Sequence, residues 1–262
     1  MSRLRPFIVL AIFAAFTLPL MPLQQLFVWT WPAMARRFPH LYHRMVSRIL
    51  GVRVKIEGEA PLAGPVLLAS NHVSWLDIVI LSAVAPVSFI AKREVNRWPF
   101  FGSLARLQRT VFVNRDRRQG TDQSRDELQA RLKAGDILVL FAEGTSSDGA
   151  EVRPFKSAFF AAAELPDVMV QPVTLAYHGH WGLPMTRRRR PSYAWYGDME
   201  MAPHLWEAMG TGPIDVTVVC HPPVALAEIG DRKALARHAE DTVRKGLAAR
   251  LAGKVSPQAE MR

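Results

Sequence analysis

The stretch Ser70-Asn71-His72-Val73-Ser74-Trp75-Leu76-Asp77 lies between two apolar runs, residues 65–69 and 78–81. This order predicts a buried strand, a polar corner and the start of a helix. An imidazole followed five residues later by a carboxylate suits general-base chemistry near neutral pH, because the carboxylate can fix the tautomer of the ring. The structural alternative makes Ser74 a helix N-cap and Asp77 the acidic residue of its capping box. Both can hold, because a helix N-terminus keeps a nearby carboxylate ionised.

Outward from this corner, apolar runs of strand length alternate with helical patterns. Strands are expected at 52–57, 65–69, 87–91, 110–113, 137–141, 168–177 and 214–220, and helices at 75–85, 98–107, 121–133, 155–165 and 231–251. Such alternation predicts an α/β fold, a single layered domain with a mostly parallel sheet flanked by helices. We expect this domain at 46–255, after an N-terminal helical membrane anchor at 1–45 and before a polar tail at 256–262.

The N-terminal segment, residues 6–34, is almost wholly apolar or aromatic. A single span needs about 20 apolar residues, so residues 7–28 could just cross, but Pro19, Pro22 and the pair Gln24-Gln25 interrupt this run. Arginines on both sides give no orientation by the positive-inside rule. A single span and a helical hairpin that returns both ends to the cytoplasm are therefore both open, and the hairpin resolves the charge conflict.

The charge of the chain predicts an anionic partner. There are 33 Lys+Arg against 23 Asp+Glu, a formal charge of +10, together with 49% hydrophobic residues. This combination favours anionic membrane lipids, for which Arg187 to Arg190 are candidate contacts. A basic stripe with interleaved aromatic residues is missing from the sequence, so no nucleic acid is expected as a partner. The single cysteine, Cys220, excludes an internal disulfide.

Polar clusters follow four of the predicted strands, where ligands bind in open α/β sheets. The clusters are Asn71-His72 with Asp77, Lys92-Arg93-Glu94, Asn114-Arg115 and residues 143–147. Their cations suit a phosphate, and Gly144 lets the backbone approach a ligand closely. His178 and His180 lack an evident third ligand, so no metal site is expected.

Motifs of competing chemistries are missing from the sequence: G-x-S-x-G, the phosphate-binding G-x-x-x-x-G-K-[ST], H-E-x-x-H and C-x-x-C. Without a protein nucleophile, His72 would most simply activate a substrate hydroxyl for direct attack on an activated acyl group.

Asn71 to Asp77 resembles the N-H-x-x-x-x-D motif of glycerolipid acyltransferases, the family of 1-acylglycerol-3-phosphate acyltransferases. Three further blocks follow in the order of that family, at residues 92–115, 141–147 and 170–173. The resemblance covers about residues 52–220, and four motifs in order are highly specific.

This resemblance implies transfer of a fatty acyl group from acyl-CoA or acyl-carrier protein to a lysolipid hydroxyl, without a cofactor. His72 would be the general base and Asp77 the group that holds its imidazole. The expected substrate contacts are Asn71, Lys92, Arg115, Glu143, Gly144 and Thr145. The resemblance also implies a membrane-associated enzyme, which we expect at the inner membrane with its catalytic domain on the cytoplasmic face.

Two departures from the family pattern bear on the acceptor. Ser146 stands where the family usually has Arg, and Ala142 where it usually has Pro. Loss of a guanidinium removes a bidentate phosphate donor. The block resembles a branch that includes lyso-ornithine lipid acyltransferases, whose acceptor has no phosphate. Lys156 or the four-arginine run could instead replace the charge, so lysophosphatidate and lyso-ornithine lipid both remain open.

A different class of function is also open. A non-catalytic basic protein that tethers partners to anionic membrane would explain the charge and the apolar N-terminus, although it would not explain four motifs in order.

Overall fold

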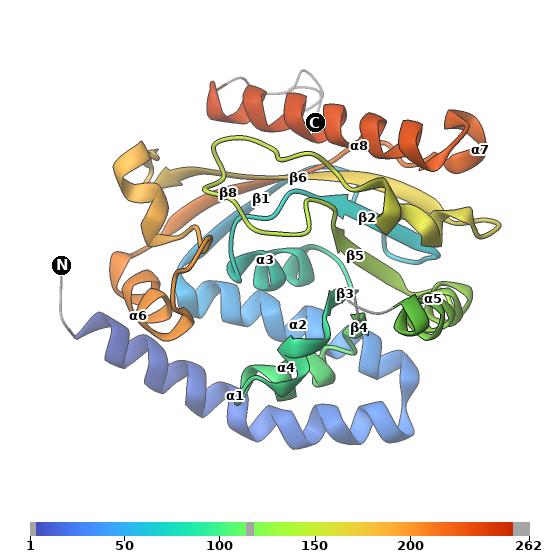
Figure 1. Cartoon of the computed structure of the whole chain (residues 1–262). Helices are drawn as coiled ribbons and strands as arrows, with labels where there is room; N and C mark the ends of the chain where they lie inside the picture. Colours follow the sequence, from blue (N-terminus) through green and yellow to red (C-terminus); the bar gives the residue numbers. More distant parts are fainter. Residues whose placement is uncertain (1–3, 114–117, 254–262) are drawn as a thin grey trace.

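A computed structural model of the chain describes residues 4–113 and 118–253, with the backbone course alone for 118–125. A nine-stranded sheet forms its middle layer, in the order β1-β8-β6-β2-β5-β3-β4, with β7 and β9 paired to β6 (Figure 1). The strands are β1 (Val52–Gly58), β2 (Val66–Ser70), β3 (Val87–Lys92), β4 (Val111–Val113), β5 (Ile137–Phe141), β6 (Met169–His180), β7 (Leu183–Pro184), β8 (Ile214–Cys220) and β9 (Val224–Ala225).

Helices cover both faces of this sheet (Figure 1). They are α1 (Arg5–Thr30), α2 (Pro32–Leu50), α3 (Leu76–Val84), α4 (Phe101–Leu107), α5 (Arg118–Lys133), α6 (Met201–Thr211), α7 (Leu226–Ile229) and α8 (Arg232–Leu251). Three 3₁₀ segments join them, η1 (Arg93–Arg97), η2 (Ser157–Glu164) and η3 (Arg187–Ser192).

The expectation of a mostly parallel sheet is confirmed. The pairs β6–β2, β2–β5, β5–β3, β3–β4 and β1–β8 are parallel. The pair β6 and β8 is antiparallel, so the sheet is mixed. Central strands such as β2 and β5 read as continuous apolar runs because helices bury both of their faces.

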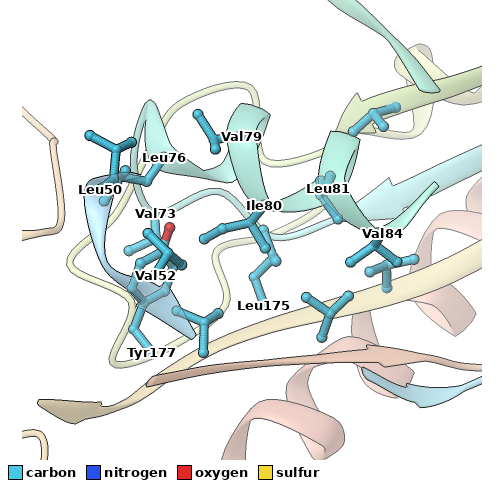
Figure 2. Close-up of a cluster of buried hydrophobic side chains, with 14 of the residues drawn as sticks. Leu50, Val52, Val73, Leu76, Val79, Ile80, Leu81, Val84, Leu175 and Tyr177 are labelled. Carbon is cyan, nitrogen blue, oxygen red and sulfur yellow. The ribbon is translucent and has the colours of Figure 1, made fainter. Parts of the chain in front are cut away.

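Two apolar clusters hold the layers together. Figure 2 shows one of them, in which Ile80 and Leu81 of α3 lie near Leu175 of β6. On the other face of the sheet, Leu235 and Val243 of α8 share a cluster with Phe160 of η2. Both clusters anchor the strands whose ends carry the polar corner.

The N-terminal helices form a hairpin that is packed on the domain. The chain turns at Trp31, and α2 then packs on α3 (Figure 1). The expected boundary at residue 45 falls inside α2, which ends at Leu50. Helix α1 keeps both prolines in its interior and is long and apolar enough to cross a membrane.

The structure differs from the predicted elements mainly at α6, because no helix was predicted at 201–211. The helix expected at 155–165 is the 3₁₀ segment η2, and the strand expected at 168–177 continues to His180. The predicted polar tail at 256–262 and the candidate Arg115 lie outside the described residues.

Candidate active site

The site lies at the carboxyl ends of adjacent parallel strands. Ser70 of β2 pairs with Phe141 of β5, so the chain leaves both strands at the same level. The Ala142 N–H donates to the Ser70 carbonyl at 3.3 Å, which keeps the two departing segments together. The loops that carry His72 and Glu143 are therefore neighbours, as expected for polar clusters that follow parallel strands.

The carboxylate of Asp77 is fully buried and accepts four hydrogen bonds. Oδ2 accepts from His72 Nδ1 at 2.8 Å and from the backbone N–H groups of Val73 and Ser74 at 2.7 and 3.0 Å. Oδ1 accepts from the Tyr177 hydroxyl at 2.6 Å. Donors of this number hold a carboxylate in one orientation.

The expected capping role of Ser74 is wrong. Helix α3 begins at Leu76, its N-cap Trp75 makes no side-chain capping bond, and the buried Ser74 hydroxyl has no partner. Only one half of the capping box is present, in which the Asp77 carboxylate accepts from the backbone N–H groups of Val73 and Ser74. The same carboxylate thus fixes both the backbone turn and the His72 ring.

His72 is held on several sides. Its backbone N–H donates to Glu143 Oε1 at 2.9 Å, and its carbonyl accepts from the Ser147 N–H at 2.9 Å. Its ring stacks on Phe141, with 3.9 Å between centroids and 16° between planes. Because a carboxylate can only accept, Nδ1 carries the hydrogen, and Nε2 is left with a lone pair. His72 lines a cavity, so this lone pair is available to a ligand there.

Glu143 holds two segments of the loop region. Besides the His72 N–H on Oε1, its Oε2 accepts from the Arg153 N–H at 3.3 Å. The side chain is 2% exposed. Burial raises the pKa of Glu143 to about 7, against the lowering effect of the two backbone donors. Through its hydrogen bond from the His72 N–H, the Glu143 side chain positions the His72 backbone.

The amide of Asn71 is also engaged with the backbone. Its Nδ2 donates to the Leu175 carbonyl at 3.0 Å, and its Oδ1 accepts from the Leu175 N–H at 2.8 Å. Asn71 is fully buried. It joins the end of β2 to β6 and has no part in the cavity wall, where a substrate contact had been predicted.

A cavity of about 760 Å³ opens in front of His72. Its walls include apolar side chains of α1, α2 and α4, such as Phe13, Phe38 and Leu104. Lys92, Gly144 and Thr145, all predicted as substrate contacts, line it together with His72 and Ser146. Volumes of this size suit a ligand of drug or lipid-chain dimensions.

Comparison with known proteins identifies the family. The family model described as Acyltransferase matches residues 51–176. A lyso-ornithine lipid O-acyltransferase of Brucella abortus is 48% identical over 98% of this chain and 99% of its own length. The chain belongs to the glycerolipid acyltransferase family.

Two other relatives mark the breadth of this acyltransferase family. A lyso-ornithine lipid O-acyltransferase of Rhizobium meliloti is 41% identical over 91% of this chain and 84% of its own. The crystal structure of a 1-acyl-sn-glycerophosphate acyltransferase from Thermotoga maritima has a TM-score of 0.70, at 24% identity, and covers 97% of this chain and 96% of its own. That likeness confirms the layered fold. Because the relatives that are 48% and 41% identical are acyltransferases, the alternative of a non-catalytic tether is replaced by an acyltransferase.

Tyr177 is the residue of this acyltransferase site that sequence reasoning missed. It lies on β6, and its burial together with the nearby Asp77 raises its pKa well above the ordinary value. The available signal was a tyrosine at the end of a buried strand, because a buried phenol needs a hydrogen-bond partner. Nothing in the linear order indicated that the partner is Asp77.

The described part of the chain contains no group of three or more His, Cys, Asp and Glu side chains that could hold a metal ion. His178 Nε2 lies 2.9 Å from Thr217 Oγ1, and His180 Nε2 lies 3.2 Å from the Thr211 carbonyl. Each of these two histidines is thus engaged with its own local partner.

Proposed function

We propose that this acyltransferase moves a fatty acyl group from a thioester donor, acyl-CoA or acyl-carrier protein, to the hydroxyl of a lysolipid. The observation that carries the proposal is that His72, oriented by Asp77, faces a 760 Å³ apolar cavity. A lipid chain in this cavity would bring its polar end to the imidazole, so that the reacting atoms meet in a fixed geometry.

In the proposed reaction His72 is the general base. Its Nε2 takes the proton from the acceptor hydroxyl as that oxygen attacks the thioester carbonyl carbon. Asp77 stabilises the imidazolium that forms, because its Oδ2 accepts from Nδ1. Collapse of the tetrahedral intermediate breaks the C–S bond, and the proton passes from His72 to the leaving thiolate. The products are an ester and a free thiol.

Lyso-ornithine lipid is the acceptor that we favour. Relatives of that name are 48% and 41% identical over more than nine-tenths of the chain. Ser146 lies at the cavity wall where the family usually has Arg, and its hydroxyl cannot bind a phosphate in the bidentate way that a guanidinium does. Lysophosphatidate is the second candidate, because a 1-acyl-sn-glycerol-3-phosphate acyltransferase of Neisseria gonorrhoeae is 37% identical over 68% of this chain.

We further propose that α1 holds the enzyme at an anionic membrane, the inner membrane approached from the cytoplasm. One side of α1 contacts the domain from Phe7, beside Trp206, to Gln24, which donates to the Leu107 carbonyl. Large apolar side chains are exposed along the rest of the helix. A helix packed along its length favours an in-plane position, with the exposed side in the lipid.

Purified protein with a panel of lysolipids and acyl thioesters tests this function. Ester formation from lyso-ornithine lipid with matching thiol release is expected, and the His72→Ala variant should lose at least about 1,000-fold in kcat. His238→Ala, on α8, is the matched histidine control and should keep full activity. Near-normal transfer by His72→Ala would exclude the proposed base, and product from lysophosphatidate alone would exclude the favoured acceptor.

A further inference from the structure

A lysine is held beside the loop that follows β5, the loop whose residues line the cavity near His72. The Lys156 N–H donates to the Ala142 carbonyl at 2.9 Å, and the Lys156 carbonyl accepts from the Phe159 N–H at 3.0 Å. These bonds fix the backbone from which the Lys156 side chain projects. The Lys156 side chain therefore starts from a backbone that is bonded to the residue preceding Glu143.

Gly144 is where the ammonium meets the cavity wall. A Cβ at this position would lie 3.0 Å from Lys156 Nζ and 3.0 Å from Phe159 Cε2, so the lysine and the ring occupy the space that any side chain would need. The backbone here has φ +76°, a left-handed conformation that favours glycine. Because Gly144 lines the cavity, Lys156 Nζ lies directly behind its rim.

The charge of Lys156 is not neutralised by a carboxylate among the residues that the structure describes. Its ammonium lies 5.7 Å from the centroid of the Phe159 ring, a cation–π contact that leaves the charge in place. Glu143, an acid of the same loop, accepts backbone N–H groups with both of its carboxylate oxygens. By contrast, Arg36, Arg109 and Arg131 all converge on Asp136. Lys156 is exposed and can take an anionic ligand.

We propose that Lys156 binds the anionic group of the lysolipid acceptor, the ornithine carboxylate or, in a phosphate-bearing acceptor, the phosphate. This inference rests on the proposed function and deepens it, because it names the headgroup contact. An ion pair at the rim would hold the headgroup outside the cavity while the acceptor hydroxyl reaches His72. Lys156 takes no part in the proton transfer, so its contribution lies in acceptor binding.

Steady-state kinetics of Lys156→Met test this inference, because methionine is an unbranched side chain that removes the charge. The KM for lyso-ornithine lipid should rise about 10- to 100-fold, the range expected when a charge-assisted contact is lost. The KM for acyl-CoA and the kcat at saturating acceptor should stay within about twofold. Lys156→Arg should restore most of the affinity, and Lys233→Met, on α8, is the matched lysine control.

Three outcomes would overturn the inference. One is an unchanged acceptor KM, the second is a rise in the acyl-CoA KM instead, and the third is an equal rise for a neutral monoacylglycerol acceptor. Parallel assays with lysophosphatidate separate a phosphate from a carboxylate as the bound group. A wild-type enzyme that acylates no lysolipid would instead contradict the proposed function itself, whatever the variant does.

Discussion

The hydroxyl of Tyr177 donates a 2.6 Å hydrogen bond to Asp77 Oδ1, and so joins two residues 100 positions apart. Asp77 Oδ2 is shared among three donors that belong to the corner itself. The phenol thus links the Asp77 carboxylate to β6, the neighbouring part of the sheet. It completes the hydrogen bonding of a buried charge, which would otherwise be costly.

We predict that Tyr177→Phe lowers kcat about tenfold and leaves the acceptor KM nearly unchanged. Phenylalanine fills the same space, but Asp77 Oδ1 loses its donor and the carboxylate is held less firmly against His72. A barrier higher by about 1.4 kcal/mol corresponds to that loss of rate. Steady-state kinetics and thermal unfolding together measure the effect.

Tyr193→Phe is the matched control for this variant. Tyr193 is also buried, but its hydroxyl has no hydrogen-bond partner. Removal of that hydroxyl should leave kcat unchanged. The melting temperature should stay the same or rise slightly. Equal behaviour of the two variants would show that the Tyr177 contact has no catalytic role.

For Asn71 we expect an effect on stability and none on substrate binding. In Asn71→Ala the buried N–H and carbonyl of Leu175 both lose their partner, at about 1–3 kcal/mol each. The melting temperature should fall by roughly 5–15 °C, while the acceptor KM of the folded enzyme stays the same. Asn96→Ala, which removes an exposed contact to Arg106, should change neither quantity. A large rise in KM without loss of stability would restore the substrate role that the sequence predicted for Asn71.

The contact between His72 and Asp77 could be predicted from the sequence because both residues lie within one seven-residue motif. The order of apolar runs likewise predicted the layers and the strand ends that meet at the site. Tyr177 and Leu175 could not be assigned, because they reach Asp77 and Asn71 only through the pairing of β6 with β2. The motif also could not separate residues that face the cavity, such as Gly144, from those that hold the backbone, such as Asn71.

Glu143 predicts a specific pH dependence of stability. Burial raises its pKa to about 7 in the folded protein, from an ordinary value of 4.5. The folded state therefore binds this proton more tightly than the unfolded state. Full stability is present below about pH 4.5, and as the pH rises to 7 the ionisation of Glu143 costs on the order of 3 kcal/mol.

Glu143→Gln should remove this part of the pH dependence. The amide cannot ionise, although its single acceptor oxygen leaves one backbone N–H unpaired and lowers stability by a constant amount. Denaturant unfolding at pH 5 and pH 7.5 gives the two free energies for each protein. The wild type should lose more stability than the variant across this interval. The same loss in both would mean that Glu143 does not carry the raised pKa.

The outer side of α1 should decide membrane binding without affecting the chemistry. Ile12 and Leu18 are 49% and 56% exposed. If these side chains are inserted in lipid, the double variant Ile12→Glu, Leu18→Glu removes both from the membrane. Each insertion contributes about 1.5–3 kcal/mol to the free energy of membrane binding. Binding to anionic vesicles should then weaken at least about 100-fold, while acyl transfer to substrates in detergent micelles continues.

Leu62→Glu, at a residue 80% exposed between β1 and β2, is the control and should bind as the wild type does. Undiminished vesicle binding by the α1 variant would place the membrane contact on another surface, such as Arg187 to Arg190.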